Sequence, residues 1–160
     1  MRIHVRSVVF GGLLGVEFIA WRGNHHDDVA RAVRHAAKTP IAGTRLYTGP
    51  DNRTHAEPMD VKLTPHVRME RNEQSKSIKA AGFLFSRRSP GFVTDWHPSS
   101  QATYQITLSG RGEIDVSGGQ TIAVSPGHLV LLDDMTGEGH RARTLGTEDW
   151  VVMLVQVDHR

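Results

Sequence analysis

The sequence predicts an all-β fold, an antiparallel β-barrel or jelly roll, over residues 44–157. Short runs rich in Val, Ile, Thr and aromatic residues recur at even spacing from residue 80, and turn residues separate them. The segment VSGGQT at 116–121 predicts a tight hairpin, because glycine supplies the positive φ that hairpin turns need. Evenly spaced short strands are typical of sandwiches and barrels.

Residues 1–43 are expected to form a separate N-terminal extension, part helical and part irregular. A short helix is predicted over 24–38, because Asn24 or Asp27 can cap it and basic residues gather toward its end. Pro40 ends it. Residues 1–21 have a basic start and an apolar stretch, as secretory signals do. Glu17 interrupts that stretch, which is also too short to span a bilayer, so a signal or membrane anchor is not expected.

The barrel strands follow from runs of β-favouring residues between turn signals. Two short strands are expected before residue 80, at RLYTG and MDVKL. The later strands are expected at AGFLFSR (81–87), GFVTDW (91–96), TYQITLS (103–109), GEIDVS (112–117), QTIAV (120–124), HLVLLDD (128–134), GHRARTL (139–145) and DWVVMLVQV (149–157).

Composition excludes several classes of function. The chain has 160 residues, a formal net charge of +2 and no cysteine. So small a positive charge gives no support for nucleic-acid binding. Without cysteine, disulfides, zinc–thiolate sites, iron–sulfur clusters and thiol nucleophiles are excluded, and any metal must use His, carboxylate, amide or water ligands. The absence of cysteine suits a cytoplasmic protein.

Two motifs give the chain a family resemblance. The first runs from Gly91 through five residues to His97 and ends at Gly110. The second is SPGHLVLLDDMTGEGHRART at 125–144, and a lead-in segment stands at 45–61. In these residues the chain resembles the cupin superfamily of small single-domain β-barrels. The resemblance implies a cupin-like barrel with a pocket inside and, in metal-binding members, three histidines and a carboxylate.

The chain departs from that ligand set. Ser99 stands at the second histidine position, Thr103 at the glutamate position and Thr144 at the closing asparagine position. His97 and His140 remain, and two imidazoles bind a divalent metal weakly without a third protein ligand.

Alternation along a strand predicts which side chains share the pocket with the histidines. Asp95 shares the face of His97 if that segment is extended. Thr103 stands at the glutamate position of the cupin-like motif, and if that side is the barrel interior, Thr103 and Gln105 point inward, while Tyr104, Ile106 and Leu108 point outward. The predicted pocket is then lined by His97, His140, Gln105, Thr103 and Asp95. Asp95, Gln105 and His55 are expected to act as substitute ligands or as polar pocket groups.

Two acidic pairs are interpreted as structural. Asp133 and Asp134 follow a strand and are expected at its solvated end, the alternative being a carboxylate at the barrel mouth near His140. HHDD at 25–28 is expected to start the capped helix, because consecutive helical residues point in different directions.

Two functions remain open. In one, the barrel binds a small polar molecule and metal is weak or absent. In the other, a cupin enzyme of dioxygenase or isomerase type holds iron, manganese, nickel or zinc on His97 and His140. A homodimer is expected because the outward apolar stripe and the run at 151–157 need a cover.

Overall fold

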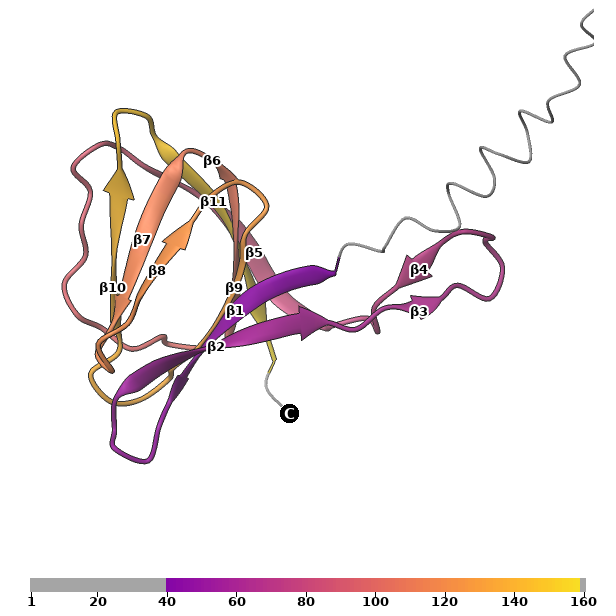
Figure 1. The fold of residues 1–160 in the computed structure, drawn as a ribbon, viewed down its shortest axis with the longest axis horizontal. Helices are drawn as coiled ribbons and strands as arrows, with labels where there is room; N and C mark the ends of the chain where they lie inside the picture. The colour runs from indigo at the N-terminus through magenta and orange to yellow at the C-terminus, as the bar shows by residue number, and fades with distance from the viewer. Residues whose placement is uncertain (1–39, 159–160) are drawn as a thin grey trace, which may run out of the picture. The chain divides into compact units, whose positions relative to one another are not determined.

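The computed structural model describes residues 40–158, and every regular element in that part of the chain is a strand (Figure 1). The strands are β1 (Ile41–Thr48), β2 (Thr54–Val61), β3 (Thr64–Pro65), β4 (Glu73–Gln74), β5 (Ala80–Arg88), β6 (Thr103–Ser109), β7 (Arg111–Val116), β8 (Thr121–Val124), β9 (Leu129–Asp133), β10 (His140–Leu145) and β11 (Trp150–Val157).

Two facing sheets form the barrel (Figure 1). The larger has the strand order β2-β1-β9-β6-β11-β5 and the smaller the order β10-β7-β8, while β3 and β4 pair with each other. β1 runs parallel to β9, and the other strand pairs of the described residues are antiparallel. The predicted all-β barrel is confirmed, except that the pair β1–β9 is parallel where an antiparallel barrel was expected. β1 begins at Ile41, shortly before the expected boundary at residue 44.

The predicted strand at 91–96 is wrong. The segment makes only isolated bridges to β10, Val93 with Arg143 and His97 with His140. Pro90 and Pro98 bracket it, and neither supplies the N–H that a continuous ladder requires. The predicted helix at 24–38, the HHDD segment and the signal-like stretch at 1–21 lie outside the described residues.

The core lies between the two sheets. Side chains from β1, β9 and β11 of the large sheet meet side chains from β7, β8 and β10 of the small one. The cluster consists of Leu46, Ile114, Val116, Val124, Val130, Leu132, Ala142, Trp150 and Val152.

Within the described residues, no helix is long and apolar enough to cross a membrane.

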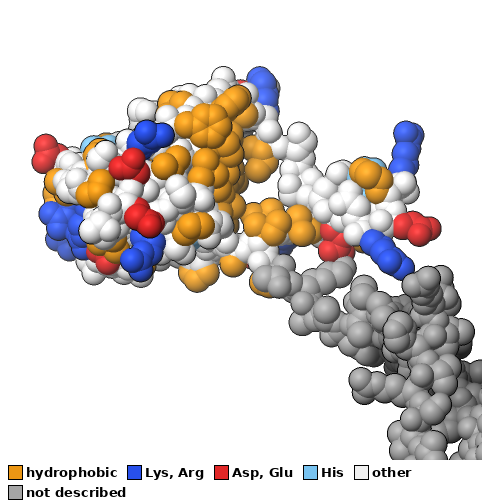
Figure 2. Space-filling model, turned by 90° about the horizontal axis from the view of Figure 1, so that it is seen from above, with side chains coloured by type: hydrophobic (Ala, Val, Ile, Leu, Met, Phe, Trp, Pro, Cys, Tyr) orange, Lys and Arg blue, Asp and Glu red, His pale blue; other side chains and the backbone are white. Residues whose placement is uncertain are grey.

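β6 has the orientation that its sequence predicts. Thr103, Gln105 and Thr107 are buried, while the residues between them are less so. A strand of this kind puts polar groups into the barrel interior, and two of them, Gln105 and Thr103, face a cavity there. Apolar side chains are correspondingly left on the outside, and Figure 2 shows them gathered in a band on one face of the barrel.

Candidate functional site

The two histidines of the cupin-like motifs meet at the edge of the small sheet. His97 and His140 exchange two backbone hydrogen bonds of 3.0 Å, and their ring centroids lie 4.7 Å apart. Gly139 makes this approach feasible. It has φ of 78°, and a Cβ atom at that position would overlap the backbone carbonyl of His97.

A buried carboxylate orients His140. Oδ2 of Asp134 accepts from Nδ1 of His140 at 2.7 Å and from Oγ1 of Thr54 at 3.0 Å. Oδ1 of Asp134 accepts from Oγ of Ser99 at 2.9 Å. Ser99 therefore supports the carboxylate that holds His140.

The prediction that Asp133 and Asp134 form a solvated strand end is wrong. Asp134 is fully buried, because it continues the inward face of Val130 and Leu132 and finds three donors there. The side chain of Asp133 is 8% exposed and pairs with Arg45 at 2.6 Å. The alternative interpretation, a carboxylate near His140, is the one that Asp134 matches.

Hydrogen-bond partners assign the tautomers of the histidine pair. Nδ1 of His97 lies 2.9 Å from the backbone oxygen of Asp95, and Nδ1 of His140 faces the Asp134 carboxylate. Both partners can only accept, so both Nδ1 atoms carry a proton, and in the neutral imidazole Nε2 then carries the lone pair. Metal-binding histidines are oriented in the same way by carbonyl or carboxylate acceptors.

The number of donors does not fit a complete metal centre. Catalytic zinc sites use three protein ligands, and iron oxygenases use two histidines and a carboxylate. In the range 40–158, no group of three or more His, Cys, Asp or Glu side chains is placed to hold a metal ion. Asp134 is occupied by three donors of its own.

A cavity of about 310 Å³ lies between the sheets, beside the histidine pair. The polar residues in its wall include His97, Ser99, Thr103, Gln105, Gln156 and His140, and the apolar ones include Ile114, Leu132 and Leu154. Four of the five predicted pocket residues line it. Asp95 does not, because it is exposed and contacts His97 through its backbone oxygen. His55 also lies outside the wall, where its Nε2 is 2.9 Å from Oδ1 of Asp51.

Arg88 is a wall residue that the sequence interpretation missed. Its Cζ atom lies 4.4 Å from the ring centroid of Trp150, and burial lowers its pKa to about 10. Nη1 of Arg88 and Nε2 of Gln105 are buried without a hydrogen-bond partner among the described residues. An unsatisfied buried donor costs about 1–3 kcal/mol. Strand parity with Leu84 places Arg88 on the cavity face, but a basic residue at a strand end usually indicates a solvent-facing position.

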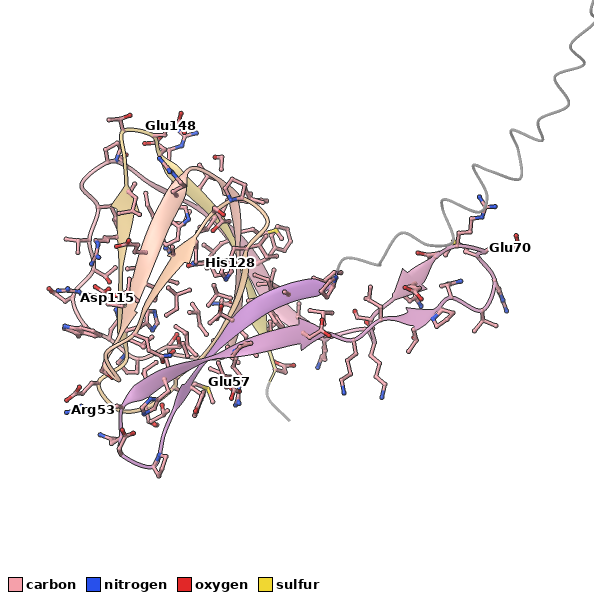
Figure 3. The ribbon with its side chains drawn as sticks, viewed as in Figure 1. Arg53, Glu57, Glu70, Asp115, His128 and Glu148 are labelled. Atoms are coloured by element: carbon pink, nitrogen blue, oxygen red, sulfur yellow. The ribbon has the colours of Figure 1, made fainter. Side chains whose placement is uncertain are left out.

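Other charged side chains pair outside the cavity. Asp115 of β7, labelled in Figure 3, accepts from Thr121 at 2.7 Å, from Arg141 at 2.9 Å and from Arg143 at 2.6 Å. Burial raises the pKa of Asp115, but these bonds outweigh burial and leave the pKa lowered. His128, also labelled, precedes β9 and has Nε2 3.1 Å from Oγ1 of Thr44. Burial lowers the pKa of His128.

The outer face of the large sheet carries a second hollow. It is an apolar groove of about 710 Å³, and Tyr104, Ile106, Leu129 and Val155 form its floor. These residues alternate with the inward residues of the same strands, so the groove and the cavity lie on opposite faces of the sheet. The groove holds none of the predicted site residues.

Comparisons with known proteins find similar solved structures only. No family model and no curated protein matches the chain. A conserved protein of unknown function from Streptococcus pyogenes is 20% identical, with a TM-score of 0.42 over 54% of this chain and 71% of that one. A cupin 2 conserved barrel domain protein from Salinispora arenicola is 20% identical, with a TM-score of 0.41 over 48% of this chain and 61% of that one. The cupin domain of Cnp3 from Schizosaccharomyces pombe is 17% identical, with a TM-score of 0.41 over 76% and 86%.

Proposed function

We propose that the barrel binds a small polar molecule in the cavity between its sheets, with metal weakly bound or absent. The observation that carries the proposal is the cavity of about 310 Å³, whose wall combines two histidines, amides and hydroxyls with aliphatic side chains. Ligand sites are typically mainly apolar hollows with a few placed polar groups, and their volumes start at about 300 Å³. The cavity reaches that volume, and its wall holds more polar than apolar residues, which favours a polar ligand.

A cavity-filling variant tests this proposal. Ala142 is a buried wall residue of β10, whereas Ala123 of β8 is exposed and lies outside the wall. Compounds from a library of small polar metabolites are scored by their effect on the melting temperature. Compounds that stabilise the parent are expected to stabilise Ala123→Leu equally and to lose their effect on Ala142→Leu. Equal stabilisation of both variants would place binding elsewhere and reject the proposal.

The second candidate is a metal-dependent cupin enzyme of dioxygenase or isomerase type. The orientation of His97 and His140 favours it, because Nδ1 of each ring faces an acceptor, which leaves Nε2 of the neutral imidazole as the metal-binding atom. The substrate would have to complete the ligand set of a bound iron, manganese, nickel or zinc ion. Elemental analysis of the untagged protein, beside the His97→Ala/His140→Ala double variant, tests this candidate. Near-stoichiometric metal that is lost in the variant supports it, and metal-free parent protein after incubation with all four ions rejects it.

We also propose a homodimer that covers the outer groove. The groove exposes the outward stripe of Tyr104 and Ile106, and exposed apolar patches of this kind mark interaction surfaces. In light scattering, Ile106→Lys is expected to have the mass of a monomer. Ala123→Lys, on the small sheet, is expected to have the same dimer mass as the parent. A parent that is already monomeric at micromolar concentration contradicts the proposal.

The cysteine-free composition supports a cytoplasmic location, which cell fractionation tests.

A further inference from the structure

Two donors in the cavity wall call for acceptor atoms that the described residues do not supply. They are Nη1 of Arg88 and Nε2 of Gln105, both buried and both without a hydrogen-bond partner. Guanidinium and amide nitrogens donate and do not accept. A molecule that satisfies both must therefore present acceptor oxygens at two places.

Arg88 also lacks an opposite charge. Burial lowers its pKa to about 10, so the guanidinium is still protonated at neutral pH. Trp150 and Phe92 offer ring faces, at 4.4 and 5.4 Å from Cζ to the ring centroid, but no negative charge. In the cavity wall that the structure describes, Arg88 is the one Lys or Arg, and there is no Asp or Glu. An unpaired buried cation is unfavourable, so a ligand that carries one negative charge would pair with Arg88.

The strand register places the two donors toward different ends of the cavity. Leu84 of β5 is opposite Leu154 of β11, which is opposite Gln105 of β6. Arg88 lies four residues beyond Leu84 on the same face. With about 3.3 Å per residue and about 4.8 Å between strands, the Cα atoms of Arg88 and Gln105 are roughly 16 Å apart. A ligand therefore meets each donor with a separate group.

We propose that the cavity binds a small monocarboxylic acid, whose carboxylate pairs with Arg88 and whose second acceptor oxygen bonds to Gln105. This inference rests on the proposed function, because it names the class of molecule that the cavity takes. The planar guanidinium fork matches a carboxylate. Ile114 and Leu154 provide aliphatic walls for the carbon segment between the two polar ends.

Calorimetry with the full chain tests the inference, with 4-oxopentanoate, pentanoate and 4-oxopentanamide as probes. The keto acid is expected to bind at least tenfold more tightly than the amide, which has the same shape without the charge. Arg88→Met should lose at least tenfold in affinity for the keto acid. Gln105→Leu should abolish the preference for the keto acid over pentanoate. An amide that binds as tightly as the acid overturns the inference and leaves the proposed function intact.

Melting temperatures measured without ligand test the role of Arg88 separately from the proposal that the cavity binds a small molecule. Arg88→Met removes an unpaired buried charge, so its melting temperature is expected to equal or exceed that of the parent. The matched control is Arg45→Met, because Arg45 pairs with Asp133 and Glu57 and its loss should lower the melting temperature. A fall for Arg88→Met as large as for Arg45→Met overturns the inference. Keto-acid binding that persists in the cavity-filling Ala142→Leu variant would instead reject the proposed function.

Discussion

Replacing Asp134 by alanine should destabilise the barrel more than any surface substitution. The carboxylate accepts three hydrogen bonds, and two of the donors, Oγ1 of Thr54 and Nδ1 of His140, belong to buried residues. Each donor left unsatisfied costs about 1–3 kcal/mol, so the pair costs about 2–6 kcal/mol. A domain of this size has a stability of about 5–15 kcal/mol, which makes the loss a large fraction of the total.

Urea unfolding followed by tryptophan fluorescence measures this loss. With a slope of about 2 kcal/mol per molar urea, a loss of about 4 kcal/mol lowers the midpoint by about 2 M. Asp134→Asn should fall between the parent and Asp134→Ala, because an amide oxygen can still accept from His140. Asp95→Ala is the matched control, because Asp95 is exposed and contacts His97 through its backbone. A midpoint for Asp134→Ala within about 0.3 M of the Asp95→Ala midpoint would show that the Asp134 hydrogen bonds do not stabilise the barrel, since that gap is under 1 kcal/mol.

Two further predictions concern stability. Gly112→Ala puts a Cβ atom against the indole of Trp150 and should cost about 1–3 kcal/mol in urea unfolding, whereas Gly82→Ala meets only an ordinary contact and should be nearly neutral. Equal midpoints for the two variants would contradict this packing argument. Burial lowers the pKa of His128 below the ordinary value of 6.5, so the unfolded chain binds more protons there and stability falls as the pH drops below about 6.5. His128→Asn should reduce the loss of stability between pH 7.5 and 5.5, and an unchanged loss would exclude this residue as a cause.

The sequence predicted the barrel because hydrophobic alternation and turn residues act locally. β6 shows this clearly, since parity separated Thr103 and Gln105 from Tyr104 and Ile106, and the glutamate position of the cupin-like motif indicated which face is inward. The histidine pair followed from the cupin-like motifs, and the structure brings His97 and His140 together. These features depend on period and spacing, which a single sequence displays.

The rest depended on contacts between distant residues. Asp134 looked like a solvated strand end because its donors, Thr54 and Ser99, are 80 and 35 residues away in sequence. Arg88 was missed because Trp150, the ring nearest to its guanidinium, is 62 residues away in sequence. Asp95 failed to reach the cavity because its segment bridges β10 at isolated points and does not form a strand. Local patterns carry no information of this kind.

Ligand binding in the cavity is tested most directly by a methyl NMR titration of the full chain with a library of small polar compounds. The methyl groups of Ala142, Leu132 and Leu154 report on the cavity, and those of Ile106 and Val155 report on the outer groove. If the cavity is the ligand site, its methyl groups shift saturably with at least one compound, while the groove methyl groups do not shift. Saturable shifts confined to the groove, with no response in the cavity, would contradict ligand binding in the cavity.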